Sequence, residues 1–224
     1  MQPYFMPYLG YWQLINCVDV FVLFDDVNFI NKGYINRNNI LFKDGPHKFS
    51  IPIQGASQNK KINELYLSDG NERKKILITI SQGYKKSLNF DLIFPIISDI
   101  FNQESIGLVD FIENSIISVC RILEINTRIV KSSKVDLPYT GFEKIIPLCK
   151  HFGASTYKNP IGGINLYEKK VFLDNGIDLR FIKMIPLEYA QLHKNFHPNM
   201  SILDLLFNAP KESWHIHLES YELI

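Results

Sequence analysis

The chain has 224 residues, 46% of them hydrophobic, and its 24 lysines and arginines almost balance 23 aspartates and glutamates. This length suits one domain, or one domain with a small appendage, because domains usually contain roughly 100–200 residues. The net charge of +1 creates no overall field for nucleic acid or an anionic membrane, so neither is an expected partner. No stretch reaches the ~18 apolar residues of a membrane span, and the amino end lacks the basic region of a signal peptide.

Three cysteines lie far apart in the sequence, at Cys17, Cys120 and Cys149, among apolar residues. An odd, widely spaced set favours buried, reduced thiols over a disulfide framework or a zinc cluster. His193 and His197 have helical spacing, but no cysteine lies near them to complete a zinc site. We therefore expect a cytoplasmic protein without a bound metal.

The first predicted elements are a helix over residues 9–18 and a strand over residues 20–24. The strand is an apolar run without alternation, which suits a strand buried on both faces of a parallel sheet. A helix that leads into such a strand implies another strand before it. We therefore expect a short strand before Gln2, of which this sequence holds only Met1. A β-hairpin follows over residues 40–51, with Asp44-Gly45 as its turn.

Helices and strands alternate over the rest of the chain. Helices are predicted from a cap at residues 69–71 to about residue 85, twice within residues 90–124 with a break near 105–107, and over 142–152, 165–174 and 201–207. Strands are predicted at residues 62–67, 128–131, 154–157 and 177–182. Ser201 is the expected N-cap of the last helix, and Asp204 completes a pair resembling a capping box.

This alternation predicts an α/β fold. We expect a mostly parallel, Rossmann-like sheet with helices on both faces, an antiparallel hairpin excursion and a helical C-terminal part. Residues 1–140 would form a nucleotide-binding-like domain with the hairpin as an insertion, and residues 141–224 a smaller part packed on it. A single domain over residues 1–224 is the alternative. The apolar segment at residues 202–207 suits the core better than the face of a homodimer.

Asp25 and Asp26 directly follow the strand predicted at residues 20–24. Ligands of open α/β sheets bind beyond the carboxyl ends of the strands, so these carboxylates are candidates for metal or hydroxyl binding. Capping and turn formation explain them equally well. The sequence contains no P-loop, GxGxxG, HExxH or GxSxG motif.

Two other loops are candidates for substrate binding. The first is stiffened by its prolines and is rich in tyrosine, and either a substrate site or a packed surface turn fits it; its candidate residues are Gln2, Pro3, Tyr4, Tyr8 and Tyr11. The second supplies cations and amides that suit phosphate or carboxylate, in Lys32, Asn36 and Arg37. Gly162 and Gly163 would let backbone approach a ligand.

Several of these motifs together resemble the WbqC-like family. They are the opening residues 2–11, residues 19–22 and 25–27, Asn36-Arg37-Asn38, and a closing motif that runs from Tyr189-x-Gln191 through residues 196–208. The resemblance covers nearly the whole chain. It implies a cytoplasmic step on an activated sugar in the synthesis of bacterial O-antigen or another surface polysaccharide. Two features depart from the family: it usually has a short strand before Gln2, and often Gln-Tyr where this chain has Asn28-Phe29.

The order of the first elements is also similar in shape to the nucleotidyltransferase-like α/β fold. Members of that fold bind ATP through a His-x-Gly-His segment, whose histidines this sequence lacks in the corresponding loop. ATP is therefore the one cofactor that the analogy suggests, and likeness of fold does not establish chemistry.

The resemblance leads us to expect an enzyme that transfers an acyl or aminoacyl group, with glycine favoured, to the amine of a nucleotide-linked amino deoxysugar, dTDP-linked sugars included. In this reading Asp25 or Asp26 is the base, with Lys32 and Arg37 holding diphosphate or carboxylate. The tyrosines would stack on the base or sugar, and Gln191 would contact sugar hydroxyls. The alternative is a non-catalytic sugar-nucleotide-binding or assembly partner of a glycosyltransferase.

Overall fold

The computed structural model describes residues 1–68, 70–104 and 107–224. The predicted helix cap at Asp69 and part of the predicted break, Ser105 and Ile106, therefore lie outside the described residues. No helix in the described part is long and apolar enough to cross a membrane.

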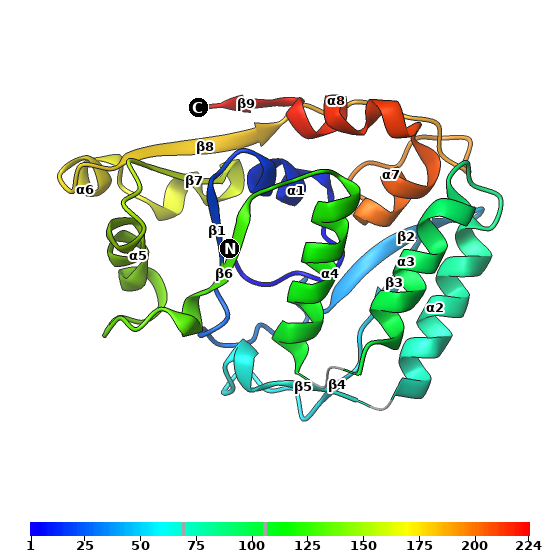
Figure 1. Cartoon of the computed structure of the whole chain (residues 1–224), viewed down its shortest axis with the longest axis horizontal. Helices are drawn as coiled ribbons and strands as arrows, with labels where there is room; N and C mark the ends of the chain where they lie inside the picture. The colour runs from blue at the N-terminus through cyan, green and yellow to red at the C-terminus, as the bar shows by residue number, and fades with distance from the viewer. Residues whose placement is uncertain (69, 105–106) are drawn as a thin grey trace.

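A two-stranded parallel sheet lies near the centre of the molecule (Figure 1). Helix α1 (Leu9–Asn16) leads into β1 (Val20–Leu23), and β1 pairs in parallel with β6 (Arg128–Lys131). Val20 is opposite Arg128, and Leu23 is opposite Lys131. The predicted strand and its parallel pairing are thus confirmed, but only Phe21 and Leu23 are buried and Val20 and Val22 are half-buried.

The predicted antiparallel hairpin is also present, formed by β2 (Arg37–Phe42) and β3 (Gly45–Ser50). Phe42 is opposite Gly45, so the two turn residues are Lys43 and Asp44 rather than Asp44 and Gly45. Gly45 is the first residue of β3 and has a φ of +118°, a conformation that glycine adopts without steric cost.

Three helices lie side by side next to the hairpin: α2 (Gly70–Tyr84), α3 (Phe90–Asn102) and α4 (Leu108–Ile122) (Figure 1). The segment before them was predicted as one strand at residues 62–67. It forms a 3₁₀ turn, η1 (Ile62–Glu64), and a short strand, β5 (Tyr66–Leu67), which pairs with β4 (Ile53–Gln54).

The C-terminal part alternates short helices and strands, and its α7 returns to lie beside α3 and β2 (Figure 1). Its elements are η2 (Ser132–Lys134), η3 (Gly141–Lys144), α5 (Ile145–His151), β7 (Thr156–Pro160), η4 (Ile161–Leu166), α6 (Lys169–Leu173), β8 (Asp178–Met184), α7 (Ile202–Asn208), η5 (Lys211–Ser213), α8 (Trp214–Glu219) and β9 (Tyr221–Leu223). β7 and β8 are parallel, and β9 is antiparallel to β8.

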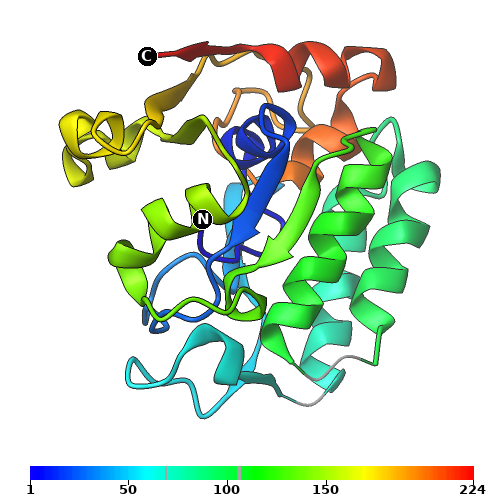
Figure 2. The same ribbon diagram turned by 60° about the vertical axis from the view of Figure 1, so that its left-hand side comes forward.

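A mixed α/β fold is therefore confirmed, but a single Rossmann-like sheet is not observed. The described residues form four small sheets, of which the largest has three strands. Among the named strands of the described chain, β1 pairs with β6 alone, so the β1–β6 sheet does not extend to β7 and β8. Figure 2 shows the two groups of strands apart, with the amino end beside β1.

Two hydrophobic clusters hold the chain together. The larger contains side chains from the amino-terminal half and returns to include residues of α7 and α8, among them Phe207 and Trp214. The smaller is built from Cys149, Phe172 and three residues of the segment into β8. The expected division at residue 140 remains a proposal.

The cysteines are free: Cys120 and Cys149 are buried and Cys17 is half-buried. Burial raises the pKa of the Cys120 thiol to about 12 and that of Cys149 to about 11, so both are protonated, inert core residues.

Ser201 caps α7 as predicted, because its Oγ accepts a hydrogen bond from Leu203 N at 3.3 Å. Asp204 does not complete a capping box. Its carboxylate instead binds side chains from α2, from the loop after β8 and from α7 itself, as described below.

Candidate functional site

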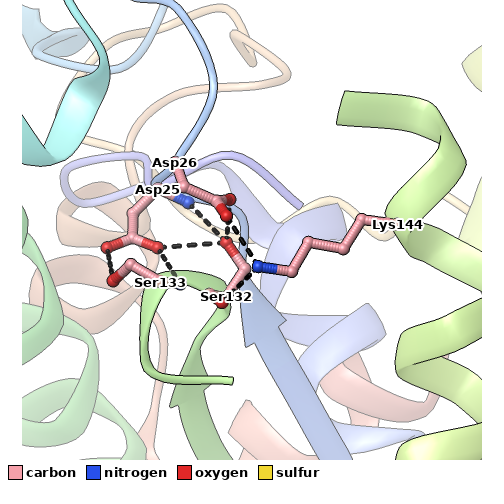
Figure 3. A network of polar contacts seen from close by, with 5 residues as sticks. All are labelled: Asp25, Asp26, Ser132, Ser133 and Lys144. Atoms are coloured by element: carbon pink, nitrogen blue, oxygen red, sulfur yellow. Dashed lines mark hydrogen bonds and ion pairs between the residues drawn. The ribbon is translucent and has the colours of Figure 1, made fainter. Parts of the chain in front are cut away.

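A polar cluster occupies the carboxyl ends of the two parallel strands (Figure 3). Asp25 and Asp26 follow β1, and Ser132 and Ser133 follow β6. Because the strands are parallel and in register, the residues that follow them emerge at the same edge of the sheet. Lys144, from the end of η3, completes the cluster.

Asp25 is the buried carboxylate of the cluster, with 1% of its surface exposed. Its Oδ1 accepts a hydrogen bond from Ser133 N at 2.9 Å, and its Oδ2 accepts one from Ser133 Oγ at 2.6 Å. Ser132 Oγ lies 3.0 Å from Asp25 Oδ1 and accepts a hydrogen bond from Asp25 N at 3.1 Å. These contacts join the ends of β1 and β6 and leave Asp25 little capacity for a ligand.

Asp26 is the more accessible carboxylate. Its Oδ2 accepts a hydrogen bond from Lys144 Nζ at 2.8 Å, and its Oδ1 contacts Ser132 Oγ. Ser132 has one hydroxyl proton, so it serves Asp25 or Asp26 but not both at once. Lys144 Nζ also donates to Ser132 O at 2.8 Å.

The charges in this cluster are unequal. Burial by itself raises the pKa of Asp26. The hydrogen bonds from Lys144 and Ser132 and the charge of Lys144 together lower it by more than burial raises it, so its pKa lies below the usual range. The side chain of Lys144 is only 4% exposed and that of Asp26 is 14% exposed. Two aspartates with one lysine leave a negative site that would attract a cation such as an amine. In the described part of the chain, no group of three or more His, Cys, Asp or Glu side chains is placed to hold a metal ion.

The tyrosine-rich opening segment, residues 2–11, is called the aromatic loop, and it starts at the same edge of the sheet. Met1 N donates to Val22 O at 2.9 Å, and Phe24 N donates to Met1 O at 2.7 Å. This pair of bonds is the parallel pattern, with Met1 opposite Leu23. Gln2 and the residues after it therefore leave the sheet at the end where Asp25 and Asp26 leave it.

Polar side chains from distant elements fix the backbone of this loop. Asn38 in β2 donates to the carbonyls of Phe5 and Met6, and Ser201 Oγ donates to Met6 O at 2.8 Å. Met6 has a φ of 45°, which is unusual for a residue other than glycine. The two carbonyl contacts hold Met6 in this conformation.

Three tyrosine hydroxyls of this region are not used by the fold. The ring centres of Tyr4 and Tyr34 lie 5.8 Å apart. Burial raises the pKa of Tyr4, and the neighbouring hydroxyls of Tyr34 and Tyr8 raise it by a smaller amount. Within the described ranges, no hydrogen bond to the hydroxyl of Tyr4, Tyr8 or Tyr34 is present. These hydroxyls are available to a ligand. Tyr11 differs, because it is buried and its hydroxyl donates to Gln2 O at 2.9 Å.

The sequence was compared with known families and proteins. The model of the WbqC-like protein family matches residues 2–216. The chain belongs to the WbqC-like protein family. It is also 26% identical over 216 residues to Rv1507c of Mycobacterium tuberculosis, a protein described only as uncharacterized, covering 95% of this chain and 94% of that one. No solved structure matches this chain.

In this WbqC-like chain, the predicted cations lie outside the Asp25–Asp26 cluster. Lys32 is exposed in the loop before β2 with a φ of 61°, and within the described residues it forms no ion pair with either aspartate. Arg37 is the first residue of β2, and no ion pair of its guanidinium is present in the described part of the chain. Asn36 Nδ2 donates to Ile51 O at 2.7 Å and supports the hairpin.

Gly163 has a packing explanation in the structure, and Gly162 does not. Gly163 is buried, and a Cβ there would lie 2.4 Å from Asn159 Nδ2, whereas a Cβ on Gly162 would meet nothing within 4 Å. Both belong to η4, which follows β7 in the sequence. Pro3 is a buried residue of the aromatic loop itself. Their predicted contacts with substrate remain predictions.

Gln191 takes part in a buried network around Asp204, which is fully buried. Asp204 accepts hydrogen bonds from Gln191 Nε2 at 2.6 Å, Tyr189 Oη at 2.8 Å, and Tyr84 Oη and Asn208 Nδ2 at 3.1 Å each. Gln191 Oε1 accepts from His197 N at 2.7 Å. Both ends of the Gln191 amide are thus used to pin the loop after β8 onto α7, and its predicted contact with a sugar stays a prediction.

Sequence reasoning missed Ser132, Ser133 and Lys144. The serines could have been found, because they follow β6 as Asp25 and Asp26 follow β1, and the same rule for strand ends applies to both. Lys144 gave no local signal, since it lies 118 residues from Asp26 in a predicted helix.

Proposed function

We propose that this WbqC-like protein transfers an acyl or aminoacyl group, with glycine favoured, to the amine of a nucleotide-linked amino deoxysugar in surface-polysaccharide synthesis. The supporting observation is the accessible, ionised Asp26 at the carboxyl ends of two parallel strands, held by Lys144 and Ser132. An open α/β sheet places its ligands at this edge. The site is negative, which suits an amine acceptor.

Asp26 has two roles in this proposal. It first attracts the protonated amine of the sugar, because its lowered pKa keeps it charged. The bound amine first gives up one proton to the solvent; the free amine then attacks the acyl carbonyl carbon, a C–N bond forms, and the bond from that carbon to the leaving group breaks. The proton that the nitrogen loses passes to Asp26, since the nitrogen becomes strongly acidic once it has attacked.

Tyrosines and cations would bind the nucleotide part. The hydroxyls of Tyr4, Tyr8 and Tyr34 suit the base or the sugar hydroxyls. Arg37 and Lys32, which have no ion pair among the described residues, suit the diphosphate. Free glycine would need activation before transfer, and ATP is the activating cofactor that we propose for a free amino-acid donor.

The direct test uses Asp26→Asn with Asp178→Asn as its matched control, because Asp178 is an exposed aspartate paired only with Arg180 at 2.6 Å. Purified proteins are incubated with dTDP-, UDP- or GDP-linked amino sugars, glycine and ATP, and N-acylated sugar is measured by mass spectrometry. We expect product from the native chain and the control, and at least a hundredfold less from Asp26→Asn, which loses both the attraction for the amine and the base.

A specific observation favours the binding-partner alternative. Asp25, Ser132 and Ser133 satisfy one another within the cluster, as they would in a purely structural site. If the native chain binds a nucleotide-linked sugar, forms no product with any donor, and Asp26→Asn binds equally well, the protein is a non-catalytic sugar-nucleotide-binding partner of a glycosyltransferase.

A further inference from the structure

Ser133 is the exposed hydroxyl of the polar cluster at the ends of β1 and β6. Its Oγ donates a hydrogen bond to Asp25 Oδ2 at 2.6 Å, and its backbone N–H donates one to Asp25 Oδ1 at 2.9 Å (Figure 3). These two bonds hold one serine against both oxygens of one carboxylate. The position of Ser133 Oγ relative to Asp25 is therefore fixed before any ligand binds.

The two residues of this pair differ in accessibility. Asp25 is only 1% exposed, whereas Ser133 is an exposed residue. A ligand that approaches from solvent therefore reaches the serine hydroxyl and not the carboxylate. Among the described residues, Ser133 Oγ is the one hydrogen-bond partner of Asp25 Oδ2, so this oxygen can take the hydroxyl proton without losing another bond.

An accessible serine in contact with a buried base is the arrangement of an activated nucleophile. A serine hydroxyl attacks poorly by itself and becomes effective when a base within about 2.6–3.2 Å of its oxygen removes the proton. The distance of 2.6 Å between Ser133 Oγ and Asp25 Oδ2 is that of a strong bond from a hydroxyl to a charged oxygen.

Ser132 cannot take the same role. It is fully buried, and its Oγ lies 3.0 Å from Asp25 Oδ1, contacts Asp26 Oδ1 and accepts a hydrogen bond from Asp25 N. An acyl carbon has no access to a hydroxyl that is enclosed in this way. Ser132 instead links the two aspartates, so the Asp25–Ser133 pair lies directly beside the Asp26 carboxylate.

We propose that Ser133 is a catalytic nucleophile that carries the acyl group from donor to acceptor, with Asp25 as its general base. This inference rests on the function proposed above. The donor belongs to the activated acyl compounds, a thioester or an acyl adenylate. Ser133 Oγ forms a bond to the acyl carbon, its proton passes to Asp25 Oδ2, and the thiolate or the nucleoside monophosphate leaves with the electron pair of the broken bond.

The second half of the reaction restores the site. The free amine of the sugar attacks the ester carbon, a C–N bond forms, and the bond from that carbon to Ser133 Oγ breaks. Asp25 returns its proton to the departing Ser133 oxygen, and Asp26 takes the proton that the nitrogen loses. The two neighbouring aspartates thus have separate roles, one on the serine and the other on the amine.

Acetylation by p-nitrophenyl acetate, an activated ester, tests the proposal without any sugar. The native chain is compared with Ser133→Ala, Ser133→Cys and Asp25→Asn, and Ser155→Ala is the control because Ser155 is an exposed serine outside the cluster. Reactions are stopped with acid, and the acetyl group is located by peptide mass spectrometry. Neutral hydroxylamine removes an ester from serine and leaves amides on lysine intact.

We expect a hydroxylamine-sensitive acetyl group on Ser133 in the native chain and in Ser155→Ala, and none at this position in Ser133→Ala. Acetylation of Ser133 should be at least a hundredfold slower in Asp25→Asn. Ser133→Cys keeps a nucleophile at the same place and should carry the acetyl group as a thioester. Should Asp25→Asn fail to fold, as judged by circular dichroism, the alanine and cysteine variants of Ser133 decide the case.

No ester on Ser133 in the native chain, or a folded Asp25→Asn that is acetylated at the native rate, would overturn the proposal. The assay for N-acylated sugar separates this inference from the function on which it rests. Native product formation by Ser133→Ala would overturn the inference and leave the proposed function standing. An ester on Ser133 in a protein that forms no N-acylated sugar would support the nucleophile and overturn the amine acceptor.

Discussion

Lys144 Nζ lies 2.8 Å from Asp26 Oδ2, and this ion pair joins the C-terminal part of the chain to the end of the first buried strand. The lysine is almost completely covered, and its second hydrogen bond goes to the carbonyl of Ser132. A single cation thus connects the residues that follow β1 and β6. Removing either partner of a buried pair leaves the other charge without compensation.

Replacement of the lysine should therefore be costly. We expect Lys144→Ala to lower the free energy of unfolding by about 3–5 kcal/mol, since Asp26 is left charged and poorly solvated. The double variant Lys144→Met with Asp26→Asn should recover part of this loss, because it removes both charges. Urea unfolding followed by circular dichroism measures both. A double variant no more stable than Lys144→Ala would show that packing rather than charge makes the lysine important.

The same pair predicts an acid dependence of stability. The pKa of Asp26 in the folded protein lies below its ordinary value of 3.8, because Lys144 and Ser132 outweigh the effect of burial. Its contribution is fully present above about pH 4 and is lost as the pH falls through the lowered pKa. Unfolding free energies of the native chain and of Asp26→Asn should converge in strong acid. A constant difference between them down to pH 2 would contradict this account.

Asp204 should show the opposite trend. Burial raises its pKa above 3.8 in spite of four hydrogen bonds, so this group costs stability as the pH rises from about 3.8 through its raised pKa. Tyr189→Phe removes the 2.8 Å donor and should destabilise the protein by about 1.5–3 kcal/mol at neutral pH, the range for hydrogen bonds to charged groups. Tyr66→Phe, an exposed tyrosine, is the control and should have no measurable effect.

Arg37 is the sharpest test of the proposed nucleotide site. We expect Arg37→Ala to weaken the affinity for a nucleotide-linked sugar at least tenfold without changing stability, because the guanidinium has no ion pair in the described part of the chain. Arg121→Ala, at the exposed end of α4, is its control. Isothermal titration calorimetry measures both. Unchanged affinity in Arg37→Ala removes this residue from the site.

Gly10 tests whether the position of Tyr8 matters. A Cβ on Gly10 would lie 2.5 Å from a ring carbon of Tyr8, so Gly10→Ala must displace that ring. Alanine also favours the helix by about 1 kcal/mol, which offsets the cost of the shift. We expect nearly native stability and reduced sugar-nucleotide affinity. Native affinity in this variant would exclude Tyr8 as a binding residue.

The sequence by itself determined the local elements and the family. Apolar runs, turn residues and the Ser201 cap act within a few residues, so β1, β6, the hairpin and the helices of residues 90–124 could be predicted. The acidic end of β1 was found by the same local reasoning. The motifs at both ends of the chain identified the WbqC-like family.

Only the tertiary structure decided how these elements are joined. Asp26 and Asp204 each bind a residue more than 100 positions away, Lys144 and Tyr84 respectively, and no local pattern predicts such contacts. The sheet is also a long-range property. Among the described strands, β1 pairs with β6 alone, so β1 and β7 belong to different sheets. A groove lies between these two strands.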